Sequence, residues 1–169
     1  MKRLLFIMML TIQSCNMEDF GSADVFLYNR SGLSIASYPA DGTNSGFSYP
    51  DTLLPRTINA FHLKENIISE DWVLSWCAPS YKHLLSGTQA GVLSVFVFNQ
   101  AIVNDEGWES VLSHQNYMVR YDLTAKDLES LQGAIYFPPS DAMRNVRMFP
   151  PYEEVIQKYP AIAGKIPAY

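Results

Sequence analysis

The stretch that decides the fold is VLSVFVF, residues 92–98. All of its residues except Ser94 are apolar, and valine and phenylalanine predominate. This composition favours a β-strand, and the lack of apolar–polar alternation is typical of a strand buried on both faces. We therefore expect residues 92–98 to lie at the centre of a sheet, with the rest of the chain built around them.

Before this strand, residues 24–28 (DVFLY) and 33–38 (LSIASY) also have strand character. The residues between them, Asn29-Arg30-Ser31-Gly32, are typical of a turn, so the two stretches predict a β-hairpin. Residues 56–63 are another strand candidate, and residues 66–76 show no clean period.

After residue 78, helix and strand signals alternate. Ser80 is a candidate N-cap for a helix in residues 79–86, and Asn104 opens a second helix. Thr124 and Asp127 have the spacing of a capping box for a third helix. The residues expected to face inward from the second and third helices are Trp108, Val111, Leu112, Leu128 and Leu131. The later strands are expected at residues 117–123 and 134–137.

This order of elements predicts an α+β fold. We expect one domain, a two-layer sandwich with a mixed or mainly antiparallel sheet and about three short helices. The length of 169 residues fits a single domain, and a hydrophobic fraction of 48% is enough for a core. A net charge of -5 argues against nucleic-acid binding, and two cysteines exclude a disulfide-rich scaffold.

The N-terminus predicts a membrane anchor. Lys2 and Arg3 precede an apolar run, residues 4–10, which is shorter than the roughly 20 residues that span a bilayer. The run ends at Ile12-Gln13-Ser14-Cys15, which resembles the lipobox of bacterial lipoproteins, although Gln13 replaces the usual small residue. The resemblance implies that Cys15 is lipidated. A plain secretory signal and a buried N-terminal helix are the alternatives.

This interpretation divides the chain into four parts. Residues 1–14 are the lipoprotein signal peptide, and residues 15–23 are a flexible tether after the lipidated Cys15. Residues 24–152 are the globular domain, and residues 153–169 are a C-terminal tail. In the tether, Glu18 and Asp19 resemble the surface-export signal of lipoproteins in the Bacteroides group, and a solvated acidic linker is the alternative.

The proline-rich stretch from residue 39 to residue 55 is the candidate binding loop, because long loops in compact domains often carry function. A cover over a sheet edge is the alternative. Asp51-Thr52-Leu53 resembles a short O-glycosylation sequon, which makes Thr52 a candidate glycosylation site. The residues proposed to contact a ligand through this loop are Tyr38, Phe47, Tyr49 and Asp51.

The side chains that usually carry catalysis do not form a recognisable pattern. His62, His83 and His114 lack metal-ligand spacing, and neither a nucleophile elbow nor a phosphate-binding loop occurs. Cys77 and His83 are close in sequence, but no flanking signature supports a dyad, and a buried structural cysteine is favoured. We therefore expect no catalytic residue, no cofactor and no metal.

Several short sequence motifs, taken together, resemble those of small lipoproteins of the Bacteroides group. This resemblance covers most of residues 15–152. The motifs are Tyr49-Pro50-Asp51-Thr52, the strand at residues 93–98, Arg120-Tyr121-Asp122-Leu123-Thr124 and Met148-Phe149-Pro150-Pro151-Tyr152. The resemblance implies an address in the cell envelope and assigns no activity.

The sequence thus predicts a lipoprotein of the outer membrane, at the cell surface or on the periplasmic face. It would act as a non-enzymatic binding or assembly module, held to the membrane through its lipid, with an envelope protein or a glycan as partner. A small envelope hydrolase that acts on glycan or peptidoglycan is the alternative, and it would need convergent carboxylates or a Cys77–His83 pair.

Overall fold

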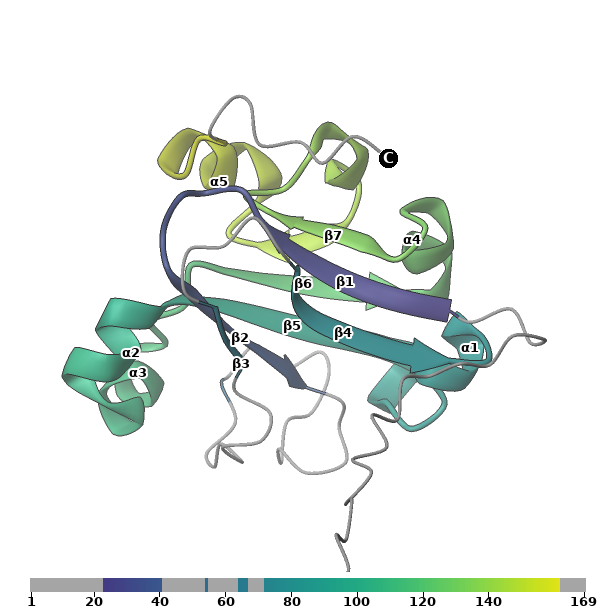
Figure 1. Cartoon of the computed structure of the whole chain (residues 1–169), viewed down its shortest axis with the longest axis horizontal. Coiled ribbons are helices and arrows are strands. Elements are labelled where there is room, and N and C mark those ends of the chain that lie inside the picture. The colour runs from purple at the N-terminus through teal and green to yellow at the C-terminus, as the bar shows by residue number, and fades with distance from the viewer. Residues whose placement is uncertain (1–22, 41–53, 55–63, 67–71, 162–169) are drawn as a thin grey trace, which may run out of the picture.

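Two β-sheets pack face to face, and short helices surround them (Figure 1). The structure is a computed structural model, and it describes residues 23–40, 54, 64–66 and 72–161. One sheet has three strands in the order β4-β1-β7, and the other has five in the order β3-β2-β5-β6-β8. The predicted α+β class in a single domain is confirmed, with two sheets where the sequence suggested one.

In the three-stranded sheet, β1 (Ala23–Asn29) lies in the middle. It pairs antiparallel with β4 (Trp72–Ala78) and parallel with β7 (Ala134–Phe137). The five-stranded sheet is antiparallel throughout. Its strands are β3 (Lys64–Asn66), β2 (Ile35–Ala40), β5 (Val92–Asn99), β6 (Val119–Thr124) and β8 (Arg147–Phe149).

The strand from which the sequence analysis began, β5, is the central strand of the larger sheet, as predicted. Val95 and Val97 face the core between the two sheets, whereas Phe96 and Phe98 belong to a second hydrophobic cluster on the opposite face. All four residues are 0% exposed. The strand lacks alternation because both of its faces are buried.

The hairpin predicted from residues 24–38 is wrong. β1 and β2 lie in different sheets, and the turn residues between them carry the chain from one sheet to the other. The Asn29 side chain accepts a hydrogen bond from Ser31 N at 3.0 Å and donates one to Leu33 O at 2.6 Å. The residues of this crossing therefore fix a local turn, while strand pairing depends on distant partners.

Five α-helices are present in the described part of the chain, compared with the three or so expected, and each has seven residues or fewer. Two 3₁₀ turns, η1 (Gln89–Gly91) and η2 (Asp141–Met143), accompany them. The helices are α1 (Tyr81–Leu84), α2 (Gln100–Glu106), α3 (Trp108–His114), α4 (Ala125–Ser130) and α5 (Tyr152–Lys158).

Two predicted helix starts are confirmed, and one is wrong. Ser80 caps α1 by accepting from His83 N, and Thr124 and Asp127 form the capping box of α4. Asn104, by contrast, lies inside α2, which begins directly after β5 with Asn99 as its cap. The helical signal after residue 104 belongs to the separate helix α3, which starts after Gly107 (φ +76°).

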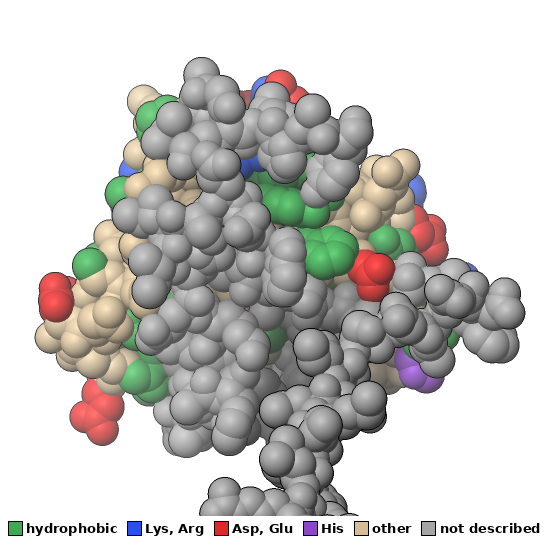
Figure 2. Space-filling view, viewed as in Figure 1, with side chains coloured by type: hydrophobic (Ala, Val, Ile, Leu, Met, Phe, Trp, Pro, Cys, Tyr) green, Lys and Arg blue, Asp and Glu red, His purple; other side chains and the backbone are tan. Residues whose placement is uncertain are grey.

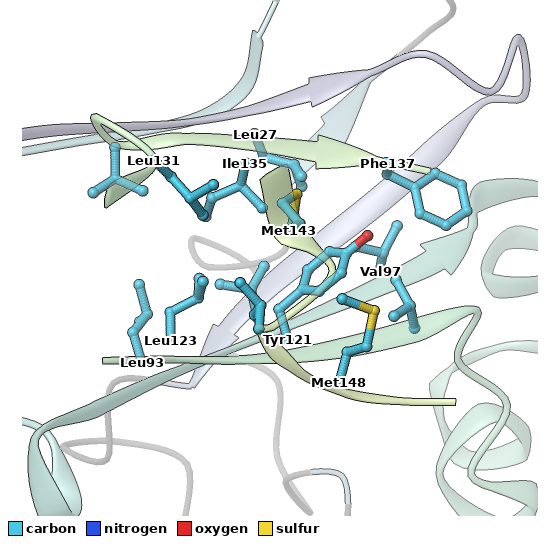
Figure 3. Close-up of a cluster of buried hydrophobic side chains, with 14 of the residues drawn as sticks. Leu27, Leu93, Val97, Tyr121, Leu123, Leu131, Ile135, Phe137, Met143 and Met148 are labelled. Atoms are coloured by element: carbon cyan, nitrogen blue, oxygen red, sulfur yellow. The ribbon is translucent and has the colours of Figure 1, made fainter. Parts of the chain in front are cut away.

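The main core fills the space between the sheets (Figure 3). Leu27 and Ile135 enter it from the smaller sheet, and Leu93, Tyr121 and Leu123 enter it from the larger one. Leu128 and Leu131 of the α4 region face this core, as the sequence predicted. Figure 3 shows the Met143 side chain between the two layers.

The globular domain continues past the boundary predicted at residue 152. Tyr152 and Val155 of α5 are buried in the main core, and the Tyr159 ring lies 5.4 Å from the Phe137 ring. Residues 153–159 therefore belong to the domain, because the helix contributes its apolar face to the core. No helix in the described residues is long and apolar enough to cross a membrane.

Candidate functional site

The outer face of the three-stranded sheet carries large aromatic side chains. Burial alternates along β1, so that Val25 and Leu27 face the core while Phe26 and Tyr28 face outward and stay half-buried. In β7 the same alternation directs Tyr136 outward. The period of two that defines a strand thus separates the core from a possible binding surface.

The register between β1 and β7 brings these rings together. Tyr28 pairs with Tyr136, and their rings stack with centroids 5.3 Å apart and an interplanar angle of 23°. Phe26 continues the row at 6.1 Å from Tyr28, tilted by 41°. At the other end, the Arg30 guanidinium lies 3.7 Å from the Tyr136 ring centroid, a cation–π contact. We call Phe26, Tyr28 and Tyr136 the aromatic row.

A pocket of about 470 Å³ opens beside the aromatic row. At this place Phe26 pairs with Ala134, so a methyl group stands where the neighbouring pair, Tyr28 and Tyr136, has a second tyrosine. In the view of Figure 2, hydrophobic side chains are exposed over the region of β1 and β7. The pocket is lined by Phe26, Tyr28, Ser130, Leu131, Gln132, Ala134, Tyr136 and Ala142.

The turn from α4 to β7 forms one wall of the pocket. Gln132 (φ +51°) and Gly133 (φ +74°) both have left-handed backbone conformations. Gly133 donates to Leu128 O at 2.9 Å, and its carbonyl accepts from Phe26 N at 2.9 Å. A Cβ at position 133 would lie 1.8 Å from Asp24 O, so only glycine permits this approach of the turn to β1. Gln132 is left-handed because it ends α4: its N–H donates to Glu129 O at 3.2 Å, and with the Gly133 bond this forms the cap that commonly closes a helix.

Hydrogen bonds from the core side fix the backbone of Tyr136. Tyr121 Oη donates a hydrogen bond of 2.9 Å to Tyr136 O, and Tyr136 N donates to the Met143 sulfur at 3.2 Å. Burial raises the pKa of the Tyr121 phenol well above its usual value of 10.0. These contacts connect the strand of the aromatic row to the core and to η2, which gives the row a fixed base.

A charged cluster lies elsewhere, within the larger sheet. Arg120 Nε and Nη2 donate to the two Asp122 carboxylate oxygens at 2.7 and 2.9 Å, and Ser94 Oγ donates to Asp122 at 2.7 Å. The Arg120 and Asp122 side chains are 0% exposed, and Arg147 Nε lies 3.7 Å from the same carboxylate. Such burial without access suits a structural ion pair. Because side chains alternate between the two faces of a strand, the sequence at residues 119–124 already implies that Arg120 and Asp122 lie on the same face of the sheet.

A second polar group joins α5 to η2. Tyr152 Oη donates to Asp141 Oδ1 at 2.9 Å, and Arg144 forms ion pairs with Asp141 and Glu153. The hydrogen bond from Tyr152, and then the contact with Arg144, lower the pKa of Asp141 below its usual 3.8. These residues are explained by the packing of α5.

Tyr38, which the sequence assigned to the binding loop, does not belong there. It lies in β2 opposite Phe96 and is 1% exposed. The strand continues through Pro39 and Ala40, so alternation directs Tyr38 into the second cluster. The other predicted residues lie outside the described part of the chain: Cys15, Glu18, Asp19, Phe47, Tyr49, Asp51 and Thr52.

The residues weighed for catalysis that the structure describes come from three different elements. His83 is exposed on α1, and His114 is exposed at the end of α3, where its Nδ1 lies 2.9 Å from Ser110 O. Cys77 lies in β4, paired in register with Asp24, and His62 is outside the described residues. Within the described residues, no group of three or more His, Cys, Asp or Glu side chains could hold a metal ion.

Sequence reasoning missed the aromatic row. Its signal was present in DVFLYNR, where Phe26, Tyr28 and Arg30 alternate with core residues. What the sequence could not give was the parallel partner, β7, which supplies Tyr136 and Ala134. Comparisons with protein-family models, curated proteins and solved structures found no match to this chain.

Proposed function

We propose that this chain is a lipid-tethered binding module of the cell envelope, whose ligand site is the pocket beside the aromatic row. The observation that carries the proposal is this pocket of about 470 Å³, which lies within the size range of small-ligand sites. Soluble domains rarely leave several aromatic rings together at a surface without a use for them.

The lining suits binding more than catalysis. It offers aromatic and aliphatic carbon, the Gln132 amide, the Ser130 hydroxyl and two phenols. These groups donate and accept hydrogen bonds but are weak acids and bases near neutral pH. Support for the tether comes from the sequence around Cys15, with an acyl chain as the anchor and residues 15–23 as the spacer.

Binding is tested without knowledge of the ligand. The purified full-length protein is mixed with detergent-free extract of the cell envelope, and its melting temperature is recorded. We expect an upward shift, because a ligand that binds only the native state stabilises it. The matched variant is Ala134→Tyr, which fills the pocket and should abolish the shift. An equal shift in both proteins would place binding elsewhere, and no shift would refute a binding function.

The tether is tested separately by fractionation of cells that carry the wild type or Cys15→Ala. We expect the wild type in the membrane fraction, with an acyl mass increment on its N-terminal peptide, and the variant in the soluble fraction. A variant that stays with the membrane would contradict the lipid anchor.

A further inference from the structure

We infer that the pocket binds a neutral saccharide, an inference that rests on the proposed function and names its ligand class. None of the eight residues that line the pocket, all of them described, is charged. A phosphorylated, sulfated or carboxylated ligand would lose its hydration without gaining an opposite charge, which is unfavourable. The lining itself therefore favours an uncharged ligand, and the neighbouring cation, Arg30, is already in contact with the Tyr136 ring.

The extent of the site favours a small ligand over a protein. Eight residues line the pocket, whereas a stable protein interface takes about 20–30 residues on each side. A single ring-shaped ligand seated over Ala134 would have Phe26 across from it and Tyr136 beside it, as the strand register requires. The pocket thus has the dimensions and the walls for one or two sugar rings.

A saccharide matches the combination of groups. The C–H face of a pyranose ring packs on aromatic carbon, since the negative ring face attracts weakly polarised C–H groups. Its hydroxyls need partners that both donate and accept, which the Gln132 amide, the Ser130 hydroxyl and the tyrosine phenols supply. A purely aliphatic ligand would leave these polar groups without partners on binding.

Gln132 supplies a polar side chain at the rim of the pocket. Its φ of +51° is unfavourable for any side chain, and glycine would relieve the strain. The side chain at this position is exposed at the rim of the pocket. Because this exposed amide both donates and accepts, we assign it the role of a hydrogen-bonding group for the sugar hydroxyls.

The test is an array of neutral and acidic glycans probed with the full-length protein, followed by calorimetric titration of the neutral oligosaccharide that gives the strongest signal. Wild type should bind neutral glycans. Gln132→Gly should weaken binding at least tenfold while its melting temperature stays equal or rises. Ala134→Tyr should abolish binding.

The matched control is Gln115→Gly. Like Gln132 at the end of α4, Gln115 closes a helix, α3, with a left-handed backbone (φ +50°), but it lies outside the pocket. Its substitution should leave glycan affinity within twofold of wild type. Equal losses in Gln115→Gly and Gln132→Gly would overturn the role of Gln132.

The failure of this inference can be told from the failure of the proposed function. Binding only to acidic glycans, or to none, would refute the saccharide assignment. If envelope extract still raises the melting temperature of wild type but not of Ala134→Tyr, and periodate treatment of the extract has no effect, the pocket binds another class of ligand. If extract and array both give nothing, both proposals fall.

Discussion

Tyr121 Oη donates a hydrogen bond of 2.9 Å to the backbone carbonyl of Tyr136, and so connects the two sheets across the core. Tyr121 comes from β6 of the larger sheet and Tyr136 from β7 of the smaller one. Figure 3 shows the Tyr121 hydroxyl pointing away from its own strand, toward the opposite layer. A buried polar group thus fixes the strand that carries part of the aromatic row.

Removing this hydroxyl should weaken the fold. Tyr121→Phe leaves the Tyr136 carbonyl without this donor in a buried place, which costs about 1–2 kcal/mol of unfolding free energy. Denaturant unfolding at neutral pH measures the change. Tyr117→Phe, a ring only partly buried on the other face, is the control and should cost less. An unchanged midpoint for Tyr121→Phe would mean that the sheets do not depend on this bond.

The same phenol predicts a loss of stability in alkali. Burial raises the pKa of Tyr121 well above 10.0, so the native state keeps its proton at a pH where the unfolded chain loses it. The native state then binds more protons than the unfolded state, and stability falls as the pH rises through about 10. Denaturant titrations at several pH values between roughly 8 and 11 measure this effect. The free energy of unfolding should decline less with pH in Tyr121→Phe than in the wild type. Identical slopes would contradict the assignment.

The buried ion pair should tolerate loss of one partner poorly. Asp122→Asn keeps the shape but removes the carboxylate charge that pairs with the buried Arg120 guanidinium, at a cost of about 3–5 kcal/mol. Arg147→Ala is the control, since that side chain is 52% exposed and 3.7 Å from the carboxylate. It should cost less than about 1 kcal/mol. Thermal unfolding followed by circular dichroism compares the two, and equal losses would refute the distinction.

Alanine substitutions at two glycines distinguish the stability cost of a steric clash from the cost of an unfavourable backbone conformation. Gly133 and Gly91 both have positive φ, at +74° and +65°, but a Cβ at Gly133 would meet Asp24 O whereas one at Gly91 would meet nothing within 4 Å. Gly91→Ala should cost about 1–2 kcal/mol, from conformation alone. Gly133→Ala should cost more, because β1 must move away from the turn. Chemical denaturation tests the order, and the reverse ranking would show that the turn adapts.

Local signals in the sequence predicted part of the local structure, although the helix start at Asn104 was wrong. The central strand at residues 92–98, the cap at Ser80 and the capping box at Thr124 could all be predicted, because each depends on neighbouring residues. The α+β class followed from the order of such elements. Strand partners did not follow, since the choice between a hairpin and a crossing between sheets at residues 29–34 depends on contacts far away in the chain.

The candidate site shows the same division. Alternation in β1 indicates that Phe26 and Tyr28 face away from the core, but only the parallel pairing with β7 adds Tyr136 and the gap at Ala134. The prediction that Tyr38 belongs to the binding loop is wrong because Pro39, a residue typical of loops, lies within β2. The lipidation, export and glycosylation predictions at Cys15, Glu18, Asp19 and Thr52 remain predictions, as these residues lie outside the described part of the structure.

The measurement that tests the central claim most directly is a methyl-detected NMR titration of alanine-labelled protein with envelope extract. Ala134 and Ala142 line the pocket, whereas Ala36 is 0% exposed in the larger sheet and serves as the internal reference. The account predicts that the methyl signals of Ala134 and Ala142 shift on addition of extract while that of Ala36 stays fixed. A shift of Ala36 alone, or no shift at Ala134 and Ala142 when the extract stabilises the protein, would contradict it.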